Sequence, residues 1–195
     1  DGLVSIQAHL GASVKKMQIK EFSEMCDLRL ALESHAAGLA ARNRNEGDLQ
    51  EIRFALEAMR RLTEAVIAAE TEQPLLGELA REDERFHIAV MSAAKNDLMK
   101  KEILRLHLIN RVLTVPLVPG ALPTQKAEVD LRRREVLEKH NDIFEAIARG
   151  DPVAAKREME FHLQEMIDHN LRLLTRAESG VLARDLSPEE LAYGS

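Results

Sequence analysis

The sequence contains no tryptophan, one tyrosine and one cysteine, and aromatic residues make up only 3% of its 195 positions. Sheet proteins depend on aromatic and β-branched side chains for their half-buried faces, so this shortage disfavours a β-rich fold. The single cysteine, Cys26, cannot form an internal disulfide, which fits a reducing compartment such as the cytoplasm. We therefore expect a cytoplasmic helical protein that is held together by its core and by any metal that it binds.

Long apolar runs are also missing. No stretch approaches the roughly 18 to 20 consecutive apolar residues of a membrane helix, and the first residues lack the pattern of a signal peptide. The net charge of −6 gives no broad attraction for phosphates, and residues 132–134 form only one short arginine cluster. We expect no membrane association and no binding of nucleic acid by this chain alone.

Apolar residues instead recur at three- and four-residue steps in successive segments, the pattern of amphipathic helices. The predicted helices span residues 21–44, 48–69, 76–95, 97–113, 124–149 and 152–176, and a short seventh begins at Ser187. A proline-rich stretch, residues 116–123, is the only long linker between them. The predicted fold class is all-α, a single antiparallel bundle of six or seven helices with a metal site in its core.

Local signals mark several helix ends. Asp48 and Glu51 have the spacing of a capping box, which opens the second helix at Asp48. Asn96 suits the left-handed position between the third and fourth helices and is expected to cap a helix end. The run Gly150-Asp151-Pro152 places a helix stop, an N-cap and a first-turn proline in succession. This run predicts a tight turn between the fifth and sixth helices.

Polar residues interrupt the apolar faces of three helices. Asp83 and His87 lie four residues apart, about 40° around the helix axis and roughly 6 Å along it. His140 lies ten residues before Gly150 and His162 eleven after Asp151, so both stand about 15 to 17 Å from the same turn. Antiparallel packing of the fifth and sixth helices therefore brings these two imidazoles to one level.

A divalent cation would explain all four positions, because it accepts the lone pairs of buried imidazoles and also binds a carboxylate. The predicted ligands of one metal ion are Asp83, His87, His140 and His162. Zinc is the first expectation, and nickel, manganese or iron also suit mixed nitrogen and oxygen donors. The alternative is a set of hydrogen-bonded core histidines, with Asp83 neutralised by a neighbouring arginine.

Catalytic motifs are sparse. A di-iron site is disfavoured because only Glu84 and His87 form a Glu-x-x-His pair, and Met159 stands where a second glutamate is needed. No Gly-rich phosphate loop or His-Glu-x-x-His helix is present. We therefore expect that this chain is not an enzyme. Two alternatives stay open: a metal-dependent enzyme that acts on small hydroxy or keto acids, and a metal-free helical interaction domain.

From Phe22 to Leu171 the chain resembles the FCD domain, the effector-binding C-terminal domain of FadR-type GntR transcription regulators. The resemblance rests on residues 28–33, 83–87, 93–98 and 140–147, followed by Gly150-Asp151, Met159 and His162-Leu163. It implies a metal held by Asp83, His87, His140 and His162, with a small organic acid bound beside it. Arg29 matches an arginine of the family's first block, which implies an effector clamp, and the alternative is an exposed ion pair with Glu33.

The resemblance also implies a domain organisation. Residues 1–18 are interpreted as a linker from a missing N-terminal winged helix-turn-helix module, residues 19–178 as the FCD domain, and residues 179–195 as a C-terminal tail with a short helix. Family members are homodimers, and contact with operator DNA would come through the missing module. His107 is expected to be structural and His169 either to support the site or to be a polar core residue. Residues 70–77 contain a slight extension with no assigned role.

Overall fold

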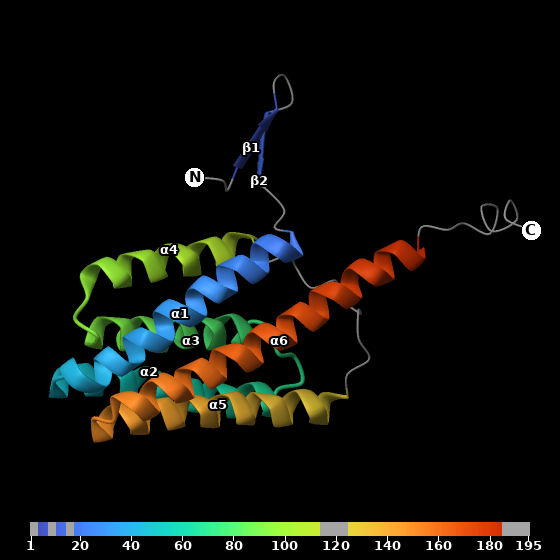
Figure 1. Cartoon of the computed structure of the whole chain (residues 1–195). Helices are drawn as coiled ribbons and strands as arrows, with labels where there is room; N and C mark the ends of the chain where they lie inside the picture. Colours follow the sequence, from blue (N-terminus) through green and yellow to red (C-terminus); the bar gives the residue numbers. More distant parts are fainter. Residues whose placement is uncertain (1–3, 8–10, 15–17, 114–124, 185–195) are drawn as a thin grey trace, which may run out of the picture.

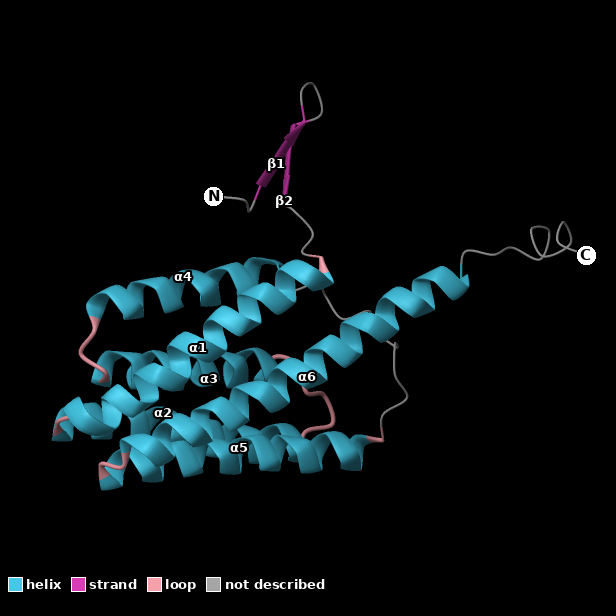
Figure 2. Ribbon diagram, in the orientation of Figure 1, coloured by secondary structure: helices cyan, strands magenta, loops and turns pink. Residues whose placement is uncertain are grey.

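The computed structural model describes residues 4–7, 11–14, 18–113 and 125–184. In this part of the chain six helices form one bundle, as predicted (Figures 1 and 2). The helices are α1 (Ile19–Asn43), α2 (Glu46–Ala68), α3 (Leu75–Ala93), α4 (Asp97–Leu113), α5 (Lys126–Arg149) and α6 (Pro152–Arg184). Within the described ranges, none of the helices combines the length and the hydropathy that crossing a lipid bilayer requires.

A small β-hairpin precedes the bundle. Its strands, β1 (Val4–Gln7) and β2 (Gly11–Val14), pair in antiparallel register with Val4 opposite Val14. The sequence analysis had assigned this segment to a linker and predicted no strand there. Each strand has only four residues, which is too short for an alternating pattern to stand out from the sequence.

α1 packs most extensively on α6, and α4 lies along the edge of the bundle against α1 and α3 (Figure 1). The core side of α1 is built from small residues, Ala36, Ala37, Ala40 and Ala41, each at most 1% exposed. At Gly38 an added Cβ would lie 3.0 Å from the carbonyl oxygen of Pro152. This small-residue face lets the backbones of α1 and α6 approach closely and brings the buried side chains of both helices into one core.

The start of α2 differs from the prediction. Asn45, not Asp48, is the N-cap: its side chain accepts a hydrogen bond from the Asp48 N–H at 2.9 Å. The Asp48 carboxylate in turn accepts from the Asn45 N–H at 2.8 Å. The capping box therefore begins three residues earlier than predicted, because Asp48 serves as its third helical residue.

The connection between α3 and α4 corrects a second detail. Lys95, with φ of 56°, takes the left-handed position that the sequence analysis gave to Asn96. Asn96 caps α4, as predicted, because its side chain accepts a hydrogen bond from the Met99 N–H at 3.1 Å. Asparagine is a favoured N-cap residue, so Asn96 stabilises the start of α4 and the left-handed conformation falls to Lys95.

The turn between α5 and α6 confirms the prediction. Gly150 has φ of 73°, and the Asp151 carboxylate accepts hydrogen bonds from the N–H groups of Val153 and Ala154. Arg44, at the end of α1, donates to the Ala148 carbonyl oxygen at 3.0 Å and so ties this turn to α1. The turn makes α5 and α6 antiparallel neighbours, as the candidate site requires.

α6 is longer than predicted. It continues to Arg184, past the expected end at Arg176 and past the domain boundary at 178. Gly180 does not stop it, since one glycine inside a helix costs only about 1 kcal/mol. The predicted cap Thr124, the linker 116–123 and the short helix from Ser187 lie outside the described residues.

Candidate metal centre

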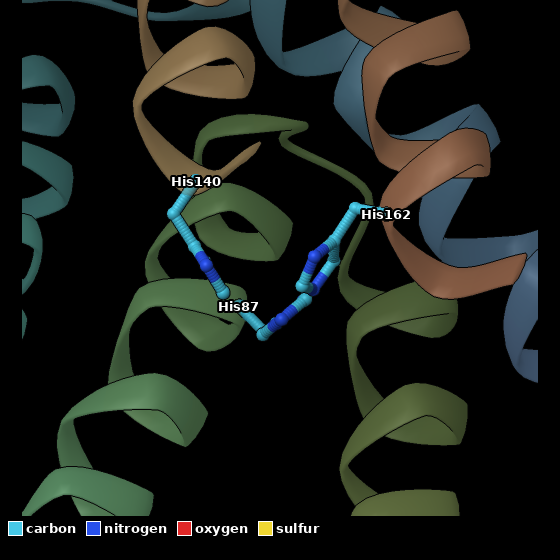
Figure 3. Close-up of side chains that lie close together, drawn as sticks. All are labelled: His87, His140 and His162. Carbon is cyan, nitrogen blue, oxygen red and sulfur yellow. The ribbon is translucent and has the colours of Figure 1, made fainter. Parts of the chain in front are cut away.

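Three buried histidines from three helices converge inside the bundle (Figure 3). His87 comes from α3, His140 from α5 and His162 from α6, and one donor atom from each lies within 4.8 Å of the other two. The ring centroids of His140 and His162 are 4.3 Å apart. The prediction that these two imidazoles share one level of the bundle is therefore confirmed.

The backbone of α5 fixes the orientation of His140. Its Nδ1 lies 2.8 Å from the carbonyl oxygen of Val136, and a carbonyl only accepts, so Nδ1 must carry the hydrogen. The lone pair of a neutral ring is then on Nε2, which lies 3.1 Å from Asp83 Oδ1. Two acceptors at this distance repel unless a proton or a cation lies between them. This arrangement fits a metal ligand whose second nitrogen is held by the backbone.

His162 supplies a second unpaired nitrogen. Its Nε2 is buried and has no hydrogen-bond partner in the described part of the chain. Burial and the neighbouring imidazoles of His140 and His87 lower the pKa of His162 well below its usual value. The ring is therefore neutral near pH 7, which is the form that binds a metal.

Asp83 lies at the edge of this histidine cluster. It contacts the cluster through His140 and keeps 41% of its side-chain exposure. Burial of its carboxyl group opposes ionisation, but the close contact with His140 and the nearby His87 and His162 hold the pKa of Asp83 well below its ordinary value. The structure thus brings three of the four predicted ligand residues into one buried group, and the fourth, Asp83, contacts this group through His140 from the exposed side.

Glu33 is a further charged residue at the site, and the sequence analysis did not select it. It lies on α1 with no exposed surface, and its Oε2 is 2.9 Å from Nδ1 of His87. The contact has the length of a hydrogen bond but not its alignment. A carboxylate on Nδ1 leaves Nε2 of His87 available to the other two histidines.

The other oxygen of Glu33 joins two more helical residues. Oε1 accepts a hydrogen bond from Arg29 Nε at 2.8 Å and lies 3.1 Å from His107 Nε2 on α4. Burial alone would raise the pKa of Glu33, but Arg29, His107 and His87 together lower it well below its ordinary value. Glu33 is therefore a buried anion that connects α1, α3 and α4.

The alternative interpretation of Arg29 as half of an exposed ion pair is wrong, although the pair itself exists. The side chains of Arg29 and Glu33 are 6% and 0% exposed. A spacing of four residues on one helix is typical of surface pairs, so the spacing alone gave no sign of burial. Only the packing of α3 and α4 against α1 shows that Glu33 belongs to the site.

Three cavities have Asp83 in their walls. The Arg29 cavity, about 410 Å³, is lined by Arg29, His107 and Met166 among others. The His162 cavity, about 310 Å³, is lined by His162, Lys139 and His169 among others. The third, about 350 Å³, lies between α2, α3 and α5. A small ligand can therefore approach the histidine cluster beside either Arg29 or His162.

Comparison with known proteins identifies the family of the chain. A family model described as FCD domain matches residues 24–165. The HTH-type transcriptional regulator LutR of Bacillus subtilis is 30% identical, over 86% of this chain and 77% of that protein. A probable D-xylose utilization operon transcriptional repressor of Paenarthrobacter nicotinovorans is 27% identical, over 83% of this chain and 63% of that protein.

Among solved structures, McbR/YncC of E. coli superposes with a TM-score of 0.70 at 17% sequence identity. The superposition covers 87% of this chain and 77% of that one. At this level of identity the likeness concerns the fold, and it covers the same helical bundle.

Proposed function

The chain belongs to the FCD-domain family of GntR transcription regulators, and we propose that it is the metal-dependent effector domain of a FadR-type member. In this proposal a small carboxylate binds at the histidine cluster and controls DNA binding by an N-terminal module. The observation that carries the proposal is the meeting of three buried imidazoles, each of which has a ring nitrogen with no hydrogen-bond partner within the described residues.

The proposed ligands of the metal are His87, His140, His162 and Asp83. Three neutral nitrogens and one carboxylate suit zinc first, and nickel, manganese or iron also accept this donor set. When bound, such an ion supplies open coordination positions that attract the carboxylate of an effector. Val136 and Glu33 hold the Nδ1 sides of His140 and His87, so the protein orients both rings before any ion arrives.

Arg29 is proposed to bind the effector. Its Nε is occupied by Glu33, but a guanidinium has five N–H donors and the side chain also lines the Arg29 cavity. An effector carboxylate at this arginine competes with Glu33 for the positive charge. Because Glu33 joins α1, α3 and α4, binding there favours one arrangement of these helices over another, which is the condition for a ligand to act as a switch.

We also propose that the regulator is a homodimer that acts on palindromic operator DNA in the cytoplasm. The dimer is tested by sedimentation equilibrium of the 195-residue chain, where a mass of one chain at micromolar concentration would contradict it.

The central experiment is metal analysis of the purified chain and of two variants, His140→Ala and His162→Ala. We expect about one equivalent of divalent metal in the parent chain and a strong loss in both variants. His35→Ala is the matched control, because His35 is exposed on α1. If both variants kept full metal content, the proposed site would be wrong.

Thermal-shift measurements with small carboxylates test the sensor function. We expect a stabilising acid whose effect disappears in the presence of a chelator. An unchanged melting temperature with chelator and with every acid would favour the metal-free interaction domain. Turnover of the stabilising acid would favour the metal-dependent enzyme, a function that the named relatives do not support, since both are named as transcription regulators.

A further inference from the structure

The third cavity beside Asp83 differs from the other two in its walls. Most of its lining is apolar and comes from α2, α3 and α5: Met59, Leu76, Leu79, Val129, Val136 and Leu137. Its volume of about 350 Å³ exceeds by many times the roughly 30 Å³ that one water occupies in the liquid. An apolar space of this size that opens beside charged groups is suited to the hydrocarbon part of a small amphipathic ligand.

The extension before α3 is anchored beside this cavity. Glu72, in the connection between α2 and α3, accepts two hydrogen bonds from Arg133 of α5, at 2.7 and 3.0 Å. Arg133 also donates to Asp130 at 2.6 Å and itself lines the cavity. This bidentate pair ties the connection between α2 and α3 to α5 beside the cavity.

The three neighbouring arginines of α5 differ in their ion pairs. Arg133 pairs with Glu72 and Asp130, and Arg134 pairs with Glu64. Arg132 makes no hydrogen bond or ion pair within the described residues, although it is half-buried and lines both the apolar cavity and the His162 cavity. The one carboxylate in the apolar cavity's lining, Asp83, is engaged by His140. Arg132 is therefore the charge in this lining that lacks a counter-ion.

We propose that the apolar cavity is a second ligand site, which binds a short aliphatic monocarboxylate with its carboxylate on Arg132 and its hydrocarbon chain between α2, α3 and α5. The site goes beyond the proposed function, because it needs neither the metal nor Arg29. Its ligand contacts α2, α3 and α5, whereas the Glu72–Arg133 pair joins α5 to the connection between α2 and α3.

The test measures the binding of acetate, butanoate and hexanoate to the 195-residue chain with chelator present. We expect affinity to rise about fourfold for each methylene that enters the cavity. Hexanol, which has the same chain without the charge, should bind much more weakly than hexanoate. Equal binding of acetate and hexanoate by the parent chain would overturn the proposal.

Two variants separate the roles of charge and chain. Arg132→Gln should weaken the binding of all three acids by about tenfold or more, whereas Arg134→Gln, which removes a paired and exposed arginine, should not. Val129→Phe should abolish the dependence on chain length, and Val153→Phe, at a position 74% exposed on α6, is its control. Equal effects of Arg132→Gln and Arg134→Gln would also overturn the proposal.

The chelator keeps this test independent of the proposed function. Loss of metal-dependent acid binding in His140→Ala concerns the metal centre alone. Loss of the length-dependent, chelator-resistant binding in Arg132→Gln concerns the second site alone.

Discussion

The buried charge of Glu33 is compensated by the residues around it. A lone carboxylate inside a helical bundle would be strongly destabilising, but Arg29 balances its charge and two imidazoles contact its oxygens. Its contact with Nδ1 of His87, at 2.9 Å, is in a position to orient this ring in the candidate metal centre.

Replacing Glu33 tests this positioning role. We expect Glu33→Gln to fold and to bind zinc about 10 to 100 times more weakly, because His87 loses the partner that orients it. The measurement is a competition titration with a chromophoric chelator. Glu24→Gln is the control, since Glu24 lies on the same helix in an exposed pair with Lys20, and an equal loss in both variants would argue against the role.

His162 predicts the pH dependence of the metal-free chain. Its folded-state pKa is lowered, by burial first and then by His140 and His87. The unfolded chain therefore binds a proton, below about pH 6.5, that the folded chain does not bind. The contribution of this residue to the free energy of unfolding is therefore fully present above that pH. It is lost as the pH falls toward the lowered pKa of His162 in the folded chain.

The measurement is urea unfolding of the chelator-treated chain between pH 7.5 and 5. We expect the midpoint to fall with pH and the fall to be smaller in His162→Gln. His169→Gln is the comparison, because His169 is less buried and its pKa is lowered by burial and by Arg132 and Arg172. If the unfolding midpoint fell more steeply with pH in His162→Gln than in the parent chain, the sign of the predicted effect would be wrong.

Residue-level prediction succeeded where local spacing sufficed. His140 and His162 flank one tight turn, so counting residues from that turn placed them together. Glu33 was missed because its partners on α3 and α4 are far away in the sequence, and its role depends on how three helices pack. Asp83 was predicted as a metal ligand, and the structure places it against His140, but its partial exposure could not be read from the helical pattern.

At the scale of helices and turns, the α5–α6 turn is the element on which the site geometry depends. Gly150 holds a left-handed conformation, and a Cβ there would lie 2.7 Å from Nη2 of Arg44. Alanine at this position would strain the turn and displace the arginine that ties it to α1.

We expect Gly150→Ala to lower the free energy of unfolding by about 1 to 2 kcal/mol. Gly77→Ala, inside the first turn of α3, should instead be neutral or stabilising by up to about 1 kcal/mol, because its Cβ would meet only the end of Arg81 at 3.8 Å. Denaturant unfolding of both variants checks the opposite signs, and a stabilising Gly150→Ala would contradict the turn's role.

Helix existence was predictable and helix ends were less so. Asn45 and Asp48 each stand three residues before an acidic residue that completes a capping box, so this spacing alone does not decide which of them is the N-cap. The prediction ended α6 at Arg176, whereas the helix continues through Gly180 to Arg184, since one glycine inside a helix costs only about 1 kcal/mol. The hairpin at the start of the chain was missed because its strands are too short for a periodic signal.

At the scale of the whole molecule, the metal should act as a cross-link between helices. We expect zinc at about 100 times its dissociation constant to stabilise the chain by about 2.7 kcal/mol, because only the folded bundle brings the three histidines together. Differential scanning calorimetry with zinc, and again after excess chelator, measures the effect. The His140→Ala variant should not respond, and a full response from it would place the ion elsewhere.

Because α6 is long, a small movement at the histidine cluster would displace the far end of this helix by a larger distance. The helix has 33 residues, and His162 is the eleventh of them, so about 33 Å of rod extends from this ligand to Arg184. In Figure 1 the far end of α6 projects beyond the neighbouring helices. A tilt of about 5° centred on His162 would move that end by about 3 Å. A small change of angle at the histidine cluster would therefore become a displacement comparable with the length of a hydrogen bond.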